Sequence, residues 1–153
     1  MKMLSLETQK FIREHQKEDV RILALQAKKY PGVDMNAAIT QIAGRQSIAH
    51  KIPSWHAVEE LIYPVHLSLE QSSSEITASY KASLIHGHSL TDLTGGFGID
   101  CAFLSQQFKK VSYVERQEQL LEQPGQNFQL LGPIPLTTTN NTGPNNLQKC
   151  PLL

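Results

Sequence analysis

The sequence predicts an α/β chain in which a helical N-terminal module precedes the opening part of a parallel sheet. Apolar side chains recur at helical spacing in the first third, and a strand, a glycine-rich turn, a helix and a second strand follow one another between Ser89 and Glu115. Five of the eight prolines then fall in residues 124–153. We therefore expect a helical module at 1–66, the start of a sheet domain at 67–123 and an irregular tail at 124–153.

The composition is that of a globular protein without a membrane-spanning segment. The 153 residues leave room for one compact domain, or for a small domain and part of another. No apolar run approaches the roughly 20 residues that cross a bilayer, and the N-terminus lacks the basic-then-apolar order of a signal peptide. We expect a cytoplasmic protein with no membrane partner, in which Cys101 and Cys150 are incidental thiols.

Charge is unevenly distributed along a chain whose net charge is zero. Residues 1–53 hold nine Lys and Arg against five Asp and Glu, whereas residues 54–153 hold five against nine. A basic module beside an acidic one favours a nucleic-acid partner only weakly, because such surpluses are common on ordinary protein surfaces.

Amphipathic helices account for the first third of the chain. One helix is predicted over residues 20–30, where the apolar residues lie on one face before Pro31 ends it. Asp34 is placed to cap the next helix, which closes before Pro53. Ser54 is expected to cap a shorter piece that Pro64 stops, and a further helix surrounds Phe11. This region therefore has apolar faces of its own.

A helix should begin near residue 72. Ser72 and Glu75 have the spacing of a capping box, in which the hydroxyl and the carboxylate each accept from the other residue's backbone N–H. Ile76, Tyr80 and Leu84 then share one helical face, and Gly87 is expected to stop the helix in a left-handed conformation.

A βαβ unit follows this helix. We predict a strand at 89–93, a helix that starts at Ile99, and a second strand at 111–115. Residues 117–123 begin another helix, which Pro124 and Gly125 should break.

The glycine turn, together with the acid that ends the second strand, indicates a nucleotide site. Gly95, Gly96 and Gly98 allow the backbone to turn sharply and to approach a ligand. Glu115 lies 19 residues after Gly96, close to where dinucleotide-binding folds place the acid that accepts hydrogen bonds from ribose hydroxyls. The combination is more specific than a glycine turn alone.

Residues around the turn favour a cationic ligand over a pyrophosphate. Cys101 stands where the G-x-G-x-x-G fingerprint has its third glycine, so NAD is disfavoured. Asp92 would repel a pyrophosphate, but it suits the ammonium group of S-adenosylmethionine. The chain has no P-loop sequence, which leaves ATP hydrolysis at such a loop without support.

Three stretches, Tyr63–Glu75, Asp92–Asp100 and Tyr113–Arg116, resemble a family of bacterial class I, S-adenosylmethionine-dependent methyltransferases. The resemblance covers roughly residues 6–122. It implies a helical N-terminal region, a Rossmann-like methyltransferase domain, a THUMP-like C-terminal domain and RNA as the methyl acceptor. The cofactor-binding residues that it implies are Asp92, Thr94, Gly95, Gly96, Phe97, Gly98, Glu115 and Arg116.

Other polar residues near this motif have weaker candidate roles. Residues 71–74 are first of all a helix cap, and Gln71 and Ser73 are secondary candidates for the carboxylate of the cofactor, because helix N-termini attract anions. Asp100 is interpreted as a first-turn acid that complements the helix dipole. His86 and His88 have no third ligand near them in sequence, and no metal site is expected.

Two departures from the family matter. The sequence contains neither an Asp-Pro motif of the kind that marks the methyl-transfer site nor a THUMP-like domain, so we expect a truncated enzyme without a catalytic base. We expect weak cofactor binding or none, because two strands cannot bury a parallel sheet that needs cover on both faces. Two alternatives remain open, namely an NAD(P)-dependent oxidoreductase and a helical nucleic-acid-binding module with a vestigial catalytic domain.

Overall fold

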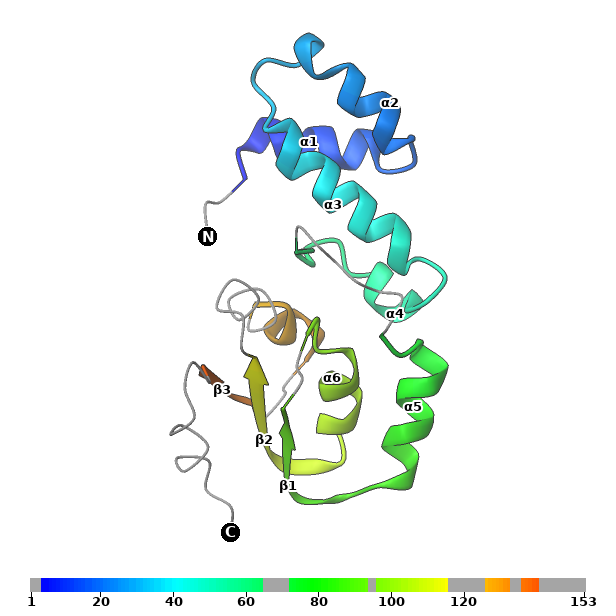
Figure 1. Cartoon of the computed structure of the whole chain (residues 1–153), viewed down its shortest axis with the longest axis vertical. Coiled ribbons are helices and arrows are strands. Elements are labelled where there is room, and N and C mark those ends of the chain that lie inside the picture. The colour runs from blue at the N-terminus through cyan, green and yellow to red at the C-terminus, as the bar shows by residue number, and fades with distance from the viewer. Residues whose placement is uncertain (1–3, 65–71, 94–95, 116–125, 133–135, 141–153) are drawn as a thin grey trace. The chain divides into compact units, whose positions relative to one another are not determined.

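The computed structural model describes residues 4–64, 72–93, 96–115, 126–132 and 136–140. The chain forms two compact units, Met1–Leu69 and Glu70–Leu153. Each unit has its own set of elements (Figure 1), and we describe each by itself. In the part of the chain that the structure describes, no helix is both long and apolar enough to cross a membrane.

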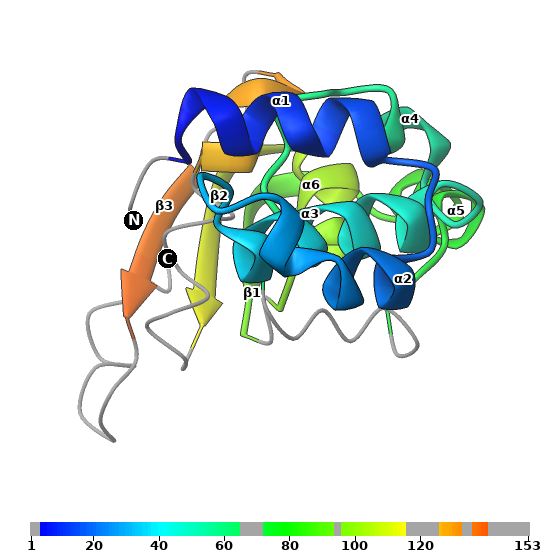
Figure 2. The same cartoon turned by 90° about the horizontal axis from the view of Figure 1, so that it is seen from above.

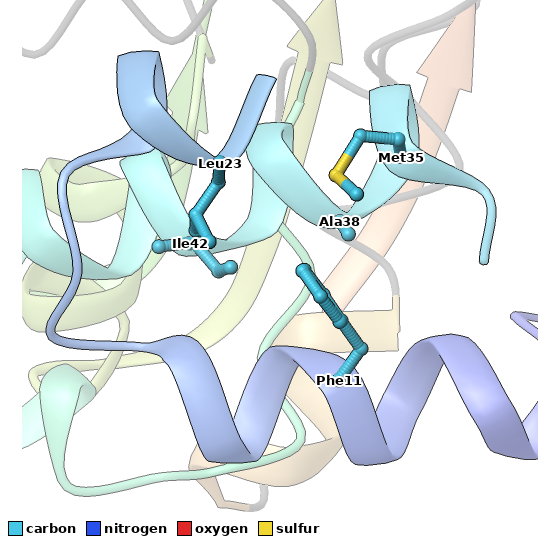
Figure 3. Packing of buried hydrophobic residues seen from close by; sticks show 5 residues of the cluster. All are labelled: Phe11, Leu23, Met35, Ala38 and Ile42. Carbon is cyan, nitrogen blue, oxygen red and sulfur yellow. The ribbon is translucent and has the colours of Figure 1, made fainter. Parts of the chain in front are cut away.

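The first unit is helical. Its elements are α1 (Leu6–His15), α2 (Val20–Leu25), the 3-10 helix η1 (Ala27–Lys29), α3 (Met35–Ile48) and α4 (Pro53–His56). Side chains from α1, α2 and α3 meet in one apolar cluster (Figure 3) formed by Phe11, Leu23, Met35, Ala38 and Ile42. The shared core explains why three short helices, each of which would be marginal alone, are stable together.

Helix boundaries in this unit match the sequence prediction in part. The Asp34 carboxylate caps α3 as predicted and accepts from the backbone N–H of Ala37 at 3.1 Å. The single helix predicted over residues 20–30 is wrong, because the chain leaves α2 at Gln26 and tightens into η1. Ser54 does not cap α4, since Pro53 occupies the first helical position and Ile52 is the N-cap; proline is favoured there because it has no N–H to satisfy.

The second unit contains a three-stranded parallel sheet. Its elements are α5 (Glu75–Leu84), β1 (Gly87–Asp92), α6 (Ile99–Ser105), β2 (Phe108–Glu115) and β3 (Leu136–Asn140), with residues 126–131 also helical. The strand order is β1-β2-β3. Helix α6 packs against β1 and β2, and α5 packs against α6 (Figures 1 and 2). The strand, glycine turn, helix and strand predicted between residues 89 and 115 are therefore present.

The start of α5 and the residue after it correct two predictions. The N-cap is Ser74, whose hydroxyl accepts from the N–H of Thr77 at 3.3 Å, so the helix begins two residues later than the predicted cap at Ser72. Gly87 is the first residue of β1 rather than a left-handed helix stop. It lies opposite Phe108, and a Cβ on it would lie 2.9 Å from the Phe108 ring. Close approach between strands therefore explains this glycine.

The tail is more regular than its sequence predicted. We expected little regular structure after Pro124, yet residues 126–131 are helical and β3 pairs with β2 from Leu136 to Asn140. Pro133 and Pro135 stand before the first residue of β3 in the sequence and lie outside the described residues. The sequence of β3 includes three consecutive threonines, a residue type that is enriched in strands.

Candidate functional site

All three strands end at the same edge of the sheet. The parallel register places Asp92 of β1 opposite Tyr113, and Glu115, two residues further along β2, opposite Asn140 of β3. Asp92 is half-buried, and the side chain of Glu115 lies outside the described part. The carboxyl ends of parallel strands are where open α/β sheets bind their ligands. Backbone register thus brings the two acids predicted to bind the cofactor to one edge.

A left-handed turn lies directly beyond β1 at this edge. Gly96 has a φ of 52° and Gly98 a φ of 83°, which glycine adopts at little cost. The hydroxyl of Tyr113 donates a hydrogen bond to the carbonyl oxygen of Gly96 at 2.6 Å, and the Tyr113 side chain is fully buried. The turn is therefore anchored to β2 by a residue that the sequence reasoning did not single out.

Gly98 has a structural role in addition to its predicted one. A Cβ at this position would overlap the ring of Phe128, a buried residue of the helical segment 126–131. Phe128 packs edge to face on Tyr113, with ring centroids 5.7 Å apart. The protein's own aromatic packing thus requires a glycine here, and contact of Gly98 with a cofactor stays a prediction. No local signal in the sequence pointed to Phe128.

Ser73 belongs to a polar network that joins the starts of α5 and α6. Its hydroxyl donates to Asp100 Oδ2 at 3.0 Å and accepts from Lys81 Nζ at 2.8 Å. Lys81 also forms an ion pair with Asp100 at 3.1 Å. Asp100 lies two residues after Gly98, so the network fixes α5 beside the glycine turn. The sequence reasoning missed Lys81, although its charge is opposite to that of Asp100.

Cys101 fills the position that a dinucleotide site keeps free of side chain. It is fully buried in α6. Burial, and secondarily the negative charge of Asp92, raise the pKa of its thiol from about 9 to about 12. The thiol therefore stays protonated near neutral pH and is a poor nucleophile. A buried side chain at this point opposes the close helix–strand packing that the third glycine of a pyrophosphate fingerprint provides.

The structure places only some of the predicted site residues. Asp92, Gly96, Phe97 and Gly98 lie together at the strand edge, with Phe97 half-buried. Gln71, Thr94, Gly95 and Arg116 lie outside the described residues. Within the described ranges, no group of three or more His, Cys, Asp and Glu residues is arranged to hold a metal ion.

Comparison with known proteins relates the fold of this chain to that of a solved structure. Neither the protein-family models nor the curated proteins contain a match to the sequence. Among solved structures, the chain is similar to a proposed methyltransferase from Porphyromonas gingivalis W83, with 29% sequence identity and a TM-score of 0.70 over 90% of this chain. The match covers 36% of that protein, so the chain spans about a third of its length. The likeness in both sequence and fold supports a methyltransferase-like α/β fold for this chain.

Proposed function

We propose that this chain carries the S-adenosylmethionine site of a methyltransferase, located at the carboxyl edge of β1 and β2. One observation carries the proposal: the parallel register ends β1 at Asp92 and β2 at Glu115 on the same edge, beside the left-handed turn at Gly96 and Gly98. The sulfonium of S-adenosylmethionine makes its methyl group electrophilic by itself. The protein's contribution is therefore to bind and orient the cofactor.

Each residue at this edge has a chemically matched role. The Asp92 carboxylate would accept hydrogen bonds from the cofactor's ammonium group, and Glu115 would accept them from the ribose hydroxyls. The turn at Gly96 would let the backbone approach the ligand closely. The buried Cys101 side chain supports this ligand over NAD, because it occupies the position of the third fingerprint glycine.

Cofactor binding by the chain alone should be weak. A doubly wound sheet binds its ligand in the crevice where the strand order reverses, so the two halves of the sheet line the site from opposite sides. The described strands form one half, with order β1-β2-β3. We therefore expect a Kd above about 100 μM for S-adenosylhomocysteine, which corresponds to a binding free energy weaker than about −5.5 kcal/mol.

The proposal is tested by ligand-observed NMR, which detects binding in this weak range. We expect saturation transfer to S-adenosylhomocysteine, and much less to NADH at the same concentration. Asp92→Asn should weaken binding of S-adenosylhomocysteine about tenfold, because a hydrogen bond to a charged group contributes about 1.5 kcal/mol. Glu60→Gln, which removes an exposed acid in the first unit, is the matched control and should bind as the wild type does. NADH binding in preference, or an Asp92→Asn variant with wild-type affinity, would refute the assignment.

We also propose RNA as the class of methyl acceptor. The support is the basic surplus of the N-terminal region, nine Lys and Arg against five Asp and Glu in residues 1–53. Over the whole first unit, residues 1–69, the count is nine against seven, so the surplus of that unit is smaller. Exposed Lys28 and Lys29 at the end of η1 form its one pair of adjacent lysine or arginine residues within the described range.

The acceptor proposal predicts weak RNA binding that falls with salt. Fluorescence anisotropy with a short single-stranded RNA should give a linear decrease of log K with log salt concentration. Replacing Lys28 and Lys29 by Gln should reduce the slope by about 1.4, since each phosphate contact in a single strand contributes about 0.7. The exposed pair Lys109 and Lys110 in the second unit is the matched control. If its replacement has the larger effect, the N-terminal unit is not the RNA-binding part.

A further inference from the structure

The first unit contains an open cavity of its own, with a volume of about 640 Å³. Its walls come from residues 16–20, which join α1 to α2, from the C-terminal end of α3 and from α4. The Gln46 side chain of α3 holds two of these walls together, because its amide nitrogen donates to the carbonyl oxygens of Gln16 at 3.0 Å and Glu18 at 2.8 Å. The volume falls in the range of roughly 300–1,000 Å³ that is typical of ligand sites.

Basic side chains gather at this cavity. Lys17, His50 and His56 line it. Arg45 lies beside it, and its guanidinium donates to the carbonyl oxygen of His56 at 2.9 Å and to Gln16 Oε1 at 3.1 Å. These acceptors are neutral, and within the described residues neither Arg45 nor Lys17 forms an ion pair with a carboxylate. Direct pairing therefore does not neutralise the positive charge at the cavity.

The two acids of the lining are already bound to protein donors. Glu18 Oε1 accepts from His15 Nδ1 at 2.7 Å, and Asp19 Oδ1 accepts from the backbone N–H of Arg21 at 2.8 Å. In the described part of the chain, the three basic side chains of the lining form neither a hydrogen bond nor an ion pair. The unused hydrogen-bonding capacity of the cavity is therefore mainly that of donors. It suits a ligand that only accepts, as an ionised phosphate group does.

His56 responds to the charge around this cavity. Burial, and secondarily the positive charges of Arg45 and His50, lower the pKa of His56 below its usual value of 6.5. The charged groups that line the cavity on its other wall are Lys17, Glu18 and Asp19. An anion bound in the cavity would oppose this shift, because it stabilises the imidazolium form. Anion binding is therefore coupled to proton uptake by His56 and should strengthen as the pH falls.

We propose that this cavity binds one phosphate group of an RNA strand, and binds it more tightly in mildly acidic solution, where His50 and His56 are charged. The inference rests on the proposal of RNA as the methyl acceptor and assigns a contact site for it in the first unit. An open cavity suits one link of a chain that continues beyond it, whereas small-molecule sites usually enclose most of their ligand. Lys17 supplies charge throughout this pH range, and the two histidines add theirs on protonation.

Fluorescence anisotropy with a short, labelled single-stranded oligouridine tests the proposal. The wild type should bind about tenfold more tightly at about pH 5.5 than at about pH 8, because the phosphodiester stays charged while the histidines gain charge. The double substitution His50→Gln and His56→Gln should remove most of this gain and leave the affinity at about pH 8 unchanged. Lys17→Gln should weaken binding at both pH values. Lys10→Gln, which alters an exposed lysine of α1 outside the lining, is the matched control and should bind as the wild type does.

Proton NMR of the histidine rings gives a second measurement. The titration midpoint of His56 should rise when the oligouridine is added, because the bound phosphate stabilises the charged ring. The ring resonances of His88 in the second unit should not respond to the RNA. A His56 midpoint that RNA leaves unchanged would contradict the proposal.

The pH dependence separates a bound phosphate from damage to the fold. A double variant that keeps the full gain at low pH overturns the proposal, and so does an equal loss at both pH values, which would indicate a damaged fold. Uridine monophosphate that displaces the labelled RNA as well as unlabelled oligouridine does would also overturn it, since the cavity then holds a free nucleotide. If the wild type binds RNA and the histidines play no part, the acceptor proposal stands without this site. If the wild type binds no RNA, both proposals fail.

Discussion

At the residue scale, two features of the fold require a glycine at position 98, although the sequence pattern explains this glycine by a bound ligand. Its φ of 83° lies in the left-handed region, and its missing side chain leaves room for the Phe128 ring. Phe128 in turn packs on Tyr113, whose hydroxyl anchors Gly96. The turn that is predicted to receive a ligand is therefore also held in place by aromatic packing.

Gly98→Ala should destabilise the protein by about 2–5 kcal/mol. The left-handed conformation costs a residue with a Cβ about 1–2 kcal/mol, and overpacking against a ring costs about 1–3 kcal/mol. Urea denaturation measures the change. Gly132→Ala is the matched control, because Gly132 has a φ of 126° but no atom within 4 Å of an added Cβ. Adding Phe128→Leu to Gly98→Ala should recover part of the loss. If Phe128→Leu recovers no stability in the Gly98→Ala background, Phe128 imposes no constraint on this position.

At the element scale, α5 and β3 show how packing partners override local pattern. The periodicity of Ile76, Tyr80 and Leu84 correctly indicates a helix, yet these residues are exposed and the small Ala78 and Ala82 are buried. Close packing on α6 favours small side chains, so the most apolar face of α5 is not its inner face. In β3 the local pattern was also overridden. The proline-rich sequence did not predict a strand, yet residues 136–140 pair in parallel with β2.

At the scale of the whole molecule, the chain consists of two units with separate cores. The first unit is built on the cluster around Leu23 and Ile42, and the second on β2 and α6, where Val111, Tyr113 and Cys101 are fully buried or nearly so. The single tryptophan, Trp55, is buried in the first unit, and Cys101 is buried in the second. Each unit therefore contains its own natural probe of unfolding.

Leu23→Ala should destabilise the first unit alone. Removing a fully buried leucine side chain costs about 2–5 kcal/mol, so the urea midpoint followed by Trp55 fluorescence should fall. The midpoint followed by Cys101 thiol labelling, measured in a Cys150→Ser background, should stay unchanged. A Leu23→Ile variant serves as the milder control, with a loss below about 1.5 kcal/mol. Parallel shifts of both midpoints would instead show that the units unfold as one.

The sequence by itself determined those features that depend on a few neighbouring residues. The α3 cap at Asp34, the glycine turn, α6 and the two strands around it follow from local patterns, because caps, turns and periodicity act over one or two turns of chain. The edge that Asp92 and Glu115 share follows from the parallel strands of a βαβ unit. Their role toward S-adenosylmethionine stays a proposal.

Only the tertiary structure decided which residues support the turn and which faces remain open. Phe128 lies 30 residues from Gly98 in the sequence, and Tyr113 lies 17 residues from Gly96. Lys81 contacts Asp100 from a different helix. The pairing of β3 with β2, and the exposure of Ile76, Tyr80 and Leu84 on α5, likewise depend on elements that lie far away in the sequence. Contacts of this kind cannot be read from a short stretch of sequence. Side-chain packing and strand register are properties of two elements together, and these elements are often distant in the sequence.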